Sequence, residues 1–193
     1  KKIILLSVPV QLLIFCEILI ASMNGIDNVL ISVYAIKEFH LGDFGVGLFY
    51  GSLGLGLILS FSIANRIRNH FLFIGLIGLF LEGIFQVLLS QTHLVVFAIL
   101  MLCGAAFMSG ICNACFDTVL MKEIDKRHHG ILFGLTATIT NTMVGISMFL
   151  SGFALQFIKP RSLGLIGGIA YILIAFIFIL SITLKGYKKR GTI

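Results

Sequence analysis

The residues best suited to chemistry are acidic side chains that interrupt long apolar stretches. The sequence has eight aspartates and glutamates, and those inside such stretches are Glu17, Asp27, Glu82 and Asp117. A charged side chain at the centre of a bilayer costs roughly 2.5–3.5 kcal/mol on insertion scales, so each of these groups needs a partner, a water-filled cavity or a proton. They are therefore the first candidates for ion or proton chemistry.

Amide and hydroxyl groups extend two of these positions into polar stripes. Glu17, Asn24 and Asn28 are spaced by 7 and 4 residues and share one face of a helix. A second stripe, at steps of 4 residues, consists of Ser109, Asn113 and Asp117. Two polar stripes on separate apolar helices are what the path of a polar solute needs. The alternative is that these groups hydrogen-bond across packed helix interfaces.

Glu17 is the best candidate for a titrating group on this path. Its short side chain lies about two turns from the nearest polar edge and cannot easily reach water. Glu82, with Gln86 one turn further on, is a second candidate for proton coupling. Asp27, nearer a membrane edge, and Asn141, in a threonine-rich stretch, complete the predicted path. The threonines themselves can satisfy their hydroxyl groups on carbonyls of their own helix.

Two further patterns have structural interpretations. Cys112 and Cys115 form a C-x-x-C pair, but neither a second pair nor a nearby histidine accompanies them. We expect them to be small packing residues. The GxxxG words at 47–51 and 130–134 are expected to let helices approach one another closely.

Enzymatic and metal chemistry find little support in the sequence. The five histidines fall in loops, and none has a carboxylate at metal-ligand spacing. The phosphate-binding pattern G-x-x-x-x-G-K-[ST] and the nucleophile pattern G-x-S-x-G do not occur. We therefore expect no catalytic residue, metal or cofactor.

Composition predicts the elements that must position these residues. Hydrophobic residues make up 59% of the 193, charged residues only 11%, and the mean hydropathy is +1.11. A soluble domain has about a quarter of its residues charged. Apolar stretches long enough to cross a ~30 Å hydrocarbon layer as helices lie at 4–36, 45–64, 71–90, 94–121, 131–158 and 163–184. The sequence therefore predicts an all-α integral membrane protein with six transmembrane helices.

Basic residues are distributed unevenly between the two sides of this topology. Three fall on one side: Lys37, Lys159 and Arg161. Eleven fall on the other: Lys1, Lys2, Arg66, Arg68, Lys122, Lys126, Arg127, Lys185, Lys188, Lys189 and Arg190. The positive-inside rule places the richer side, with both termini, in the cytoplasm. Because these residues lie in short loops, the net charge of +6 predicts a membrane face rather than a nucleic-acid partner.

Short words recur between the first three stretches and the last three. The matched words begin, in order, at Asp27 and Asp117, Gly47 and Gly130, and Gly75 and Gly164, at separations of 90, 83 and 89 residues. A three-helix unit that is repeated enters the membrane from the opposite side, and such inverted pairs are typical of secondary transporters. Chance similarity among apolar helices is the alternative. We predict one domain over 1–193 with repeat units 1–90 and 91–193.

With this layout the chain resembles the C-terminal six helices of the major facilitator superfamily, and within it the bacterial drug and siderophore exporters. The likeness covers essentially the whole chain. Residues 127–134 (RHHGILFG) match a loop of that branch that ends in Arg, Gly and Phe. Residues 65–70 (NRIRNH) are a degenerate form of the cytoplasmic signature G-x-x-x-D-R-x-G-R-[KR]. The family's antiporter signature, a Gly-Pro followed by paired glycines, is absent.

The resemblance implies a twelve-helix carrier with its solute path between two halves. The missing N-terminal half would lie upstream of Lys1, which is not a Met and which we expect to mark a cut in a longer chain, or a second copy would replace it. The first and fourth stretches correspond to the family's seventh and tenth helices, which line the cavity. The third, with Glu82, corresponds to a peripheral helix, so Glu82 would turn inward or contact another chain. The implied cytoplasmic gating-loop residues are Asn65, Arg66, Arg68 and Arg127.

These observations predict a secondary active transporter of the bacterial plasma membrane. The expected activity is proton-coupled efflux of a small amphipathic compound, with the lipid bilayer, the solute and protons as partners. The alternatives are the membrane domain of an ATP-driven transporter, an intramembrane enzyme and a membrane accessory protein without transport of its own.

Overall fold

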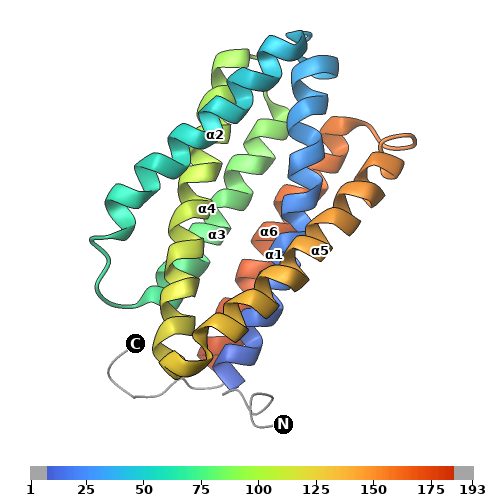
Figure 1. Ribbon diagram of the computed structural model, residues 1–193. Coiled ribbons are helices and arrows are strands. Elements are labelled where there is room, and N and C mark those ends of the chain that lie inside the picture. The colour runs from blue at the N-terminus through green and yellow to red at the C-terminus, as the bar shows by residue number, and fades with distance from the viewer. Residues whose placement is uncertain (1–7, 185–193) are drawn as a thin grey trace.

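The computed structural model describes residues 8–184, and its regular structure is helical throughout (Figure 1). The six long helices are α1 (Val8–Val33), α2 (Gly42–Ala64), α3 (Phe71–Gln91), α4 (Val95–Glu123), α5 (His129–Ala154) and α6 (Pro160–Leu184). A π-helix, η2 (Tyr34–Glu38), continues α1, and a 3-10 turn, η3 (Lys126–His128), precedes α5. Six helices are long and apolar enough to cross a membrane, which confirms the all-α class and the predicted stretches. The start of the first stretch, at 4–7, lies outside the described residues.

The helices end where the sequence offers a turn. Gly42, with φ at +60°, lies at the first position of α2, where the left-handed backbone favours a residue without a Cβ. Pro160 opens α6, where its missing N–H interrupts no helical hydrogen bond. The fifth helix ends at Ala154 rather than at the predicted 158, and a turn leads into this proline. The residue before a proline is disfavoured in a helix, so Lys159 cannot readily continue α5 into α6.

The helices pack in an order that differs from their order in the sequence. α4 lies between α2 and α3, α3 packs against α6, and α1 lies between α6 and α5. Figure 1 shows the start of α1, the end of α6 and the 65–70 and 122–128 connections at one end of the bundle. The cytoplasmic location of that end remains a prediction.

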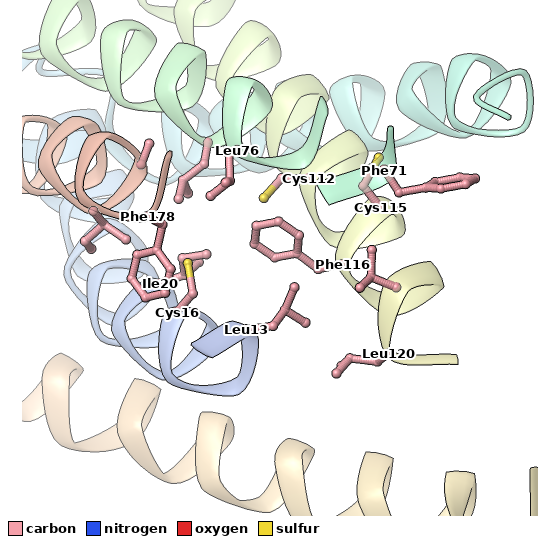
Figure 2. Packing of buried hydrophobic residues seen from close by; sticks show 14 of the residues in the cluster. Leu13, Cys16, Ile20, Phe71, Leu76, Cys112, Cys115, Phe116, Leu120 and Phe178 are labelled. Atoms are coloured by element: carbon pink, nitrogen blue, oxygen red, sulfur yellow. The ribbon is translucent and has the colours of Figure 1, made fainter. Parts of the chain in front are cut away.

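Two apolar clusters hold the bundle together, one towards each end. The larger one joins α1, α3, α4 and α6, and Figure 2 shows Ile20, Leu76, Phe116 and Phe178 converging in it. Cys112 and Cys115 are buried in the same cluster as free thiols, in keeping with a packing role. The second cluster centres on Tyr34 of η2, Phe49 of α2 and Leu102 of α4.

An ion pair fastens the bundle at the end opposite the described chain termini. Arg161 Nε donates to Glu38 Oε2 at 2.6 Å, which joins the start of α6 to η2. Arg161 Nη1 donates to the carbonyl oxygen of Thr92 at 2.6 Å, just after α3. One guanidinium therefore ties three segments that are distant in the sequence.

The GxxxG words do not mediate the predicted helix contacts. A Cβ atom added at any glycine of the 47–51 or 130–134 word would meet nothing within 4 Å in the described chain. Close backbone approaches occur instead at other glycines. Gly56 on α2 lies against the backbone of α4, and Gly25 on α1 lies against α5. The prediction was wrong because the spacing of glycines does not determine which face of a helix meets a neighbour.

Large apolar side chains cover much of the outer surface. Phe44, Phe61, Phe149 and Phe157 are each more than 70% exposed. A surface of this kind would associate in water, whereas lipid solvates it without cost. The exposed face is consistent with an integral membrane protein.

Candidate functional site

A groove of about 400 Å³ opens between α1, α4 and α5. α1 and α4 barely touch each other along this side, because α1 packs on α5 and α6 while α4 packs on α2 and α3. The groove's polar lining comes from all three helices: Glu17 and Asn24, Asn113 and Asp117, and Thr136, Thr140 and Asn141. Apolar side chains, including Ile20 and Phe133, line the rest. The groove is thus amphipathic.

The groove unites five of the residues predicted for the solute path. These are Glu17, Asn24, Asn113, Asp117 and Asn141. The other two lie elsewhere. The Asp27 side chain points toward α3 and α6, and the Asn28 backbone carbonyl accepts a 3.4 Å bond from the hydroxyl of Tyr50 on α2.

The groove carries negative charge without a basic side chain in its lining. Its acidic side chains are Glu17 and Asp117. The lining residues contributed by the described chain include no lysine, arginine or histidine. Such a surface attracts protons and cations and disfavours anions.

The threonines of α5 explain why so polar a helix is stable at this depth. The hydroxyl of Thr140 donates to the carbonyl oxygen of Thr136 at 2.9 Å, and those of Thr138 and Thr142 bond carbonyls one turn back in the same way. Each hydroxyl is therefore satisfied on its own helix. Asn141 has no such local partner to satisfy its amide and lies at the groove.

A second cavity, of about 270 Å³, lies between α2 and α4 and shares Asn113 and Asp117 with the groove. Asn65, one of the predicted gating-loop residues, lines its end. Arg66, Arg68 and Arg127 are exposed and line neither cavity. Asn113 and Asp117 of α4 therefore border both the groove and this second cavity.

Behind the groove, a buried polar cluster joins α1, α3 and α6. The hydroxyl of Tyr171 lies 2.8 Å from Asn24 Oδ1 and 2.9 Å from Asp27 Oδ2. Gln86 Nε2 donates to the same Asp27 oxygen at 3.0 Å. Glu82 lies one turn before Gln86 on α3, is only 4% exposed, and turns inward rather than toward lipid. We call these five residues the inner cluster.

Sequence reasoning missed Tyr171, which connects the inner cluster to the groove through Asn24. Tyr171 is fully buried in α6. A tyrosine inside an otherwise apolar span was the available signal, because a buried phenolic hydroxyl needs a hydrogen-bond partner. The helix to which it would bond could not be inferred from one span alone.

Within residues 8–184, no three His, Cys, Asp or Glu side chains are grouped closely enough to hold a metal ion. Comparisons with protein families, curated proteins and solved structures find no match to this chain. The class that the fold defines is thus an all-α protein with six helices able to span a membrane.

Proposed function

We propose that this protein is a secondary active transporter that moves a small amphipathic compound, most readily a cationic one, in exchange for protons. The carrying observation is that Glu17, Asn24, Asn113, Asp117 and Asn141 meet in one groove from three helices. Structural polar residues would pair with one another in packed interfaces, whereas these line an open space. Carboxylates beside aromatic and aliphatic side chains suit a solute with a charged and an apolar part.

The packing of the helices supports an inverted repeat. α4 packs against α2 and α3 much as α1 packs against α5 and α6, and α3 packs against α6 between them. The repeated words that begin at Gly75 and Gly164 make equivalent contacts in the two units. Gly75 on α3 approaches α4 at Cys115 and Phe116, and Gly164 on α6 approaches α1 at Leu30 and η2 at Tyr34. Two inverted units of this kind can exchange inward-open and outward-open shapes.

The groove is open on one side, so a complete path needs a second wall. We propose that another six-helix unit supplies it, either an N-terminal half or a second copy, as in the major facilitator superfamily. The bacterial plasma membrane, with both termini cytoplasmic, is the proposed location. Membrane lipid, the solute and protons are then the partners.

Transport by the full-length protein in everted membrane vesicles tests this proposal. Ethidium, a cationic amphipathic dye, serves as the solute, and an internal pH indicator reports proton movement. We expect dye uptake that collapses when the pH gradient is dissipated. An ATP-dependent uptake that survives this treatment would favour an ATP-driven transporter, and no uptake from a panel of cationic, neutral and anionic dyes would favour an accessory protein.

Glu17→Gln is the informative variant in this assay. The change keeps the size of the side chain but removes the proton-carrying group, so we expect normal folding and at least a tenfold loss of pH-driven uptake. Ile18→Leu, one position along the helix and outside the groove lining, is the control and should transport normally. Undiminished uptake by Glu17→Gln across a pH series would remove Glu17 from the mechanism.

A further inference from the structure

The inner cluster contains two carboxyl groups for which the described chain provides no positive charge. The two groups are Asp27 on α1 and Glu82 on α3. The other titratable groups around them include Tyr34 on η2, Cys112 on α4 and Tyr171 on α6, none of which carries a positive charge. The one ion pair within residues 8–184 joins Arg161 to Glu38. Glu82 is buried and Asp27 is half-buried, so two charged carboxylates here would repel strongly with little compensation by water. The cluster therefore holds at least one proton.

Hydrogen-bond donors are divided unequally between the two carboxyl groups. Tyr171 and Gln86 both donate to Asp27 Oδ2. Glu82 Oε2, by contrast, is buried without any hydrogen-bond partner, and the neighbouring donor to this side chain is the Ser109 hydroxyl on α4. A neutral carboxyl group tolerates a missing partner far better than a carboxylate does. The geometry therefore assigns the negative charge to Asp27 and the proton to Glu82.

We propose that Asp27 and Glu82 form a proton-binding site, separate from Glu17 and set behind the solute groove. The ligand is a proton rather than a metal ion. Within residues 8–184 the pair has no third carboxylate, histidine or thiolate with which to complete a coordination sphere. Two of the polar groups beside Asp27 present hydrogens to it rather than lone pairs.

Tyr171 gives this site a route to the groove. Its single hydroxyl hydrogen is shared between Asp27 in the inner cluster and Asn24, which lines the groove. A hydroxyl group donates fully to only one acceptor at a time. Loss of the proton from Glu82 increases the negative charge around Asp27 and draws the Tyr171 hydrogen toward it, which frees the Asn24 carbonyl to bind a solute donor. This coupling rests on the proposed transport function, whereas the proton site itself does not.

Infrared difference spectroscopy of the purified full-length protein tests the site without any transport. As the pH rises, the stretching band of a protonated, buried carboxyl group should disappear. In a Glu17→Gln background, which removes the glutamate of the groove, glutamate-selective ¹³C labelling should shift this band, Glu82→Gln should abolish it completely, and Asp27→Asn should move its titration midpoint. A band of full intensity in Glu82→Gln, or an unchanged midpoint in Asp27→Asn, would overturn the proposal. Loss of the band on adding Na⁺ at fixed pH would instead assign a sodium site.

Folding and function are checked separately. The buried thiols of Cys16, Cys112 and Cys115 react with a fluorogenic maleimide only when the bundle opens, so a thermal reaction profile reports folding of each variant. If Glu82→Gln does not fold, Glu82→Asp retains a carboxyl group and must shift the band; an unshifted band would overturn the site. A titrating Glu82 in a protein that transports no dye would defeat the transporter proposal alone.

Discussion

At the scale of single residues, Tyr171 joins α6 to two positions of α1 through one hydroxyl group. Its two acceptors, Asn24 and Asp27, lie one turn apart on α1, at 2.8 and 2.9 Å from the hydroxyl oxygen. The Tyr171 hydroxyl itself is fully buried, so these two side chains are its partners in place of water. The hydroxyl therefore contributes to stability and sets the orientation of a groove-lining amide.

We expect Tyr171→Phe to destabilise the protein by about 1 kcal/mol, the order found for buried hydrogen bonds in membrane helices and soluble cores. The ring remains, so packing is retained while Asn24 and Asp27 lose a donor. The matched control is Tyr50→Phe, whose exposed hydroxyl makes a 3.4 Å bond to the Asn28 carbonyl oxygen. Reversible unfolding in mixed micelles measures both. Equal stability of the two variants would contradict the role given to Tyr171.

At the scale of elements, α5 has two different faces. Thr136, Thr140 and Asn141 line the groove, whereas Thr138 and Thr142 are exposed away from it. The hydroxyl group of a threonine on either face can bond a carbonyl oxygen of α5 itself. The presence of threonines therefore does not show which face of α5 lines the groove. Packing against α1 decides which face meets the groove.

The two faces of α5 are therefore predicted to differ in their access to water. In a variant whose native cysteines are replaced, Thr140→Cys should react with a membrane-impermeant thiol reagent, because the groove is wet. Thr142→Cys, half a turn away and exposed outside the groove, is expected to face lipid and should react at least tenfold more slowly, because thiolates form poorly in lipid. Rate constants from mass spectrometry compare the two. Equal rates would mean that the groove is not a water-filled path.

The contact between α2 and α4 gives a second prediction at this scale. A Cβ at Gly56 would overlap the Cys103 carbonyl oxygen and the Phe107 backbone nitrogen, which cannot move aside as a flexible side chain can. We expect Gly56→Ala to destabilise the protein by about 1–3 kcal/mol. Gly54→Ala is the control, since its Cβ would meet nothing within 4 Å. Thermal unfolding should leave Gly54→Ala unchanged or slightly more stable.

At the scale of the whole molecule, the start of α1, the end of α6 and the loops at 65–70 and 122–128 lie at one end of the bundle (Figure 1). Among the described residues, this end has the basic side chains Arg66, Arg68, Lys122, Lys126 and Arg127, and the other end has Lys37, Lys159 and Arg161. The positive-inside rule therefore predicts that this end is cytoplasmic.

Labelling in intact cells tests the orientation. We expect Lys159→Cys to react with an impermeant maleimide from outside, because the positive-inside rule predicts that its loop faces away from the cytoplasm. Arg66→Cys should react only after the membrane is permeabilised. Both positions are exposed in the structure, so accessibility within the protein does not separate them. Reaction of Arg66→Cys alone in intact cells would reverse the topology.

The sequence by itself determined the class of this protein, its six helices and the positions of its polar residues. Long apolar runs have no stable alternative to a helix in lipid, since every backbone polar group must be satisfied within the segment. Periodicity then places Glu17 and Asn24 on one face of α1, and Asn113 and Asp117 on one face of α4.

Only the tertiary structure decided which of these faces meet. A helix face is defined by local spacing, but its neighbour depends on packing between segments that may be adjacent or far apart in the sequence. Asp27 is three residues from Asn24, yet it points into the inner cluster with Gln86 and Tyr171, while Asn24 reaches both cluster and groove. The glycines of the GxxxG words met no neighbour for the same reason. Helix neighbours are selected by the fit of whole surfaces, which no single stretch of sequence encodes.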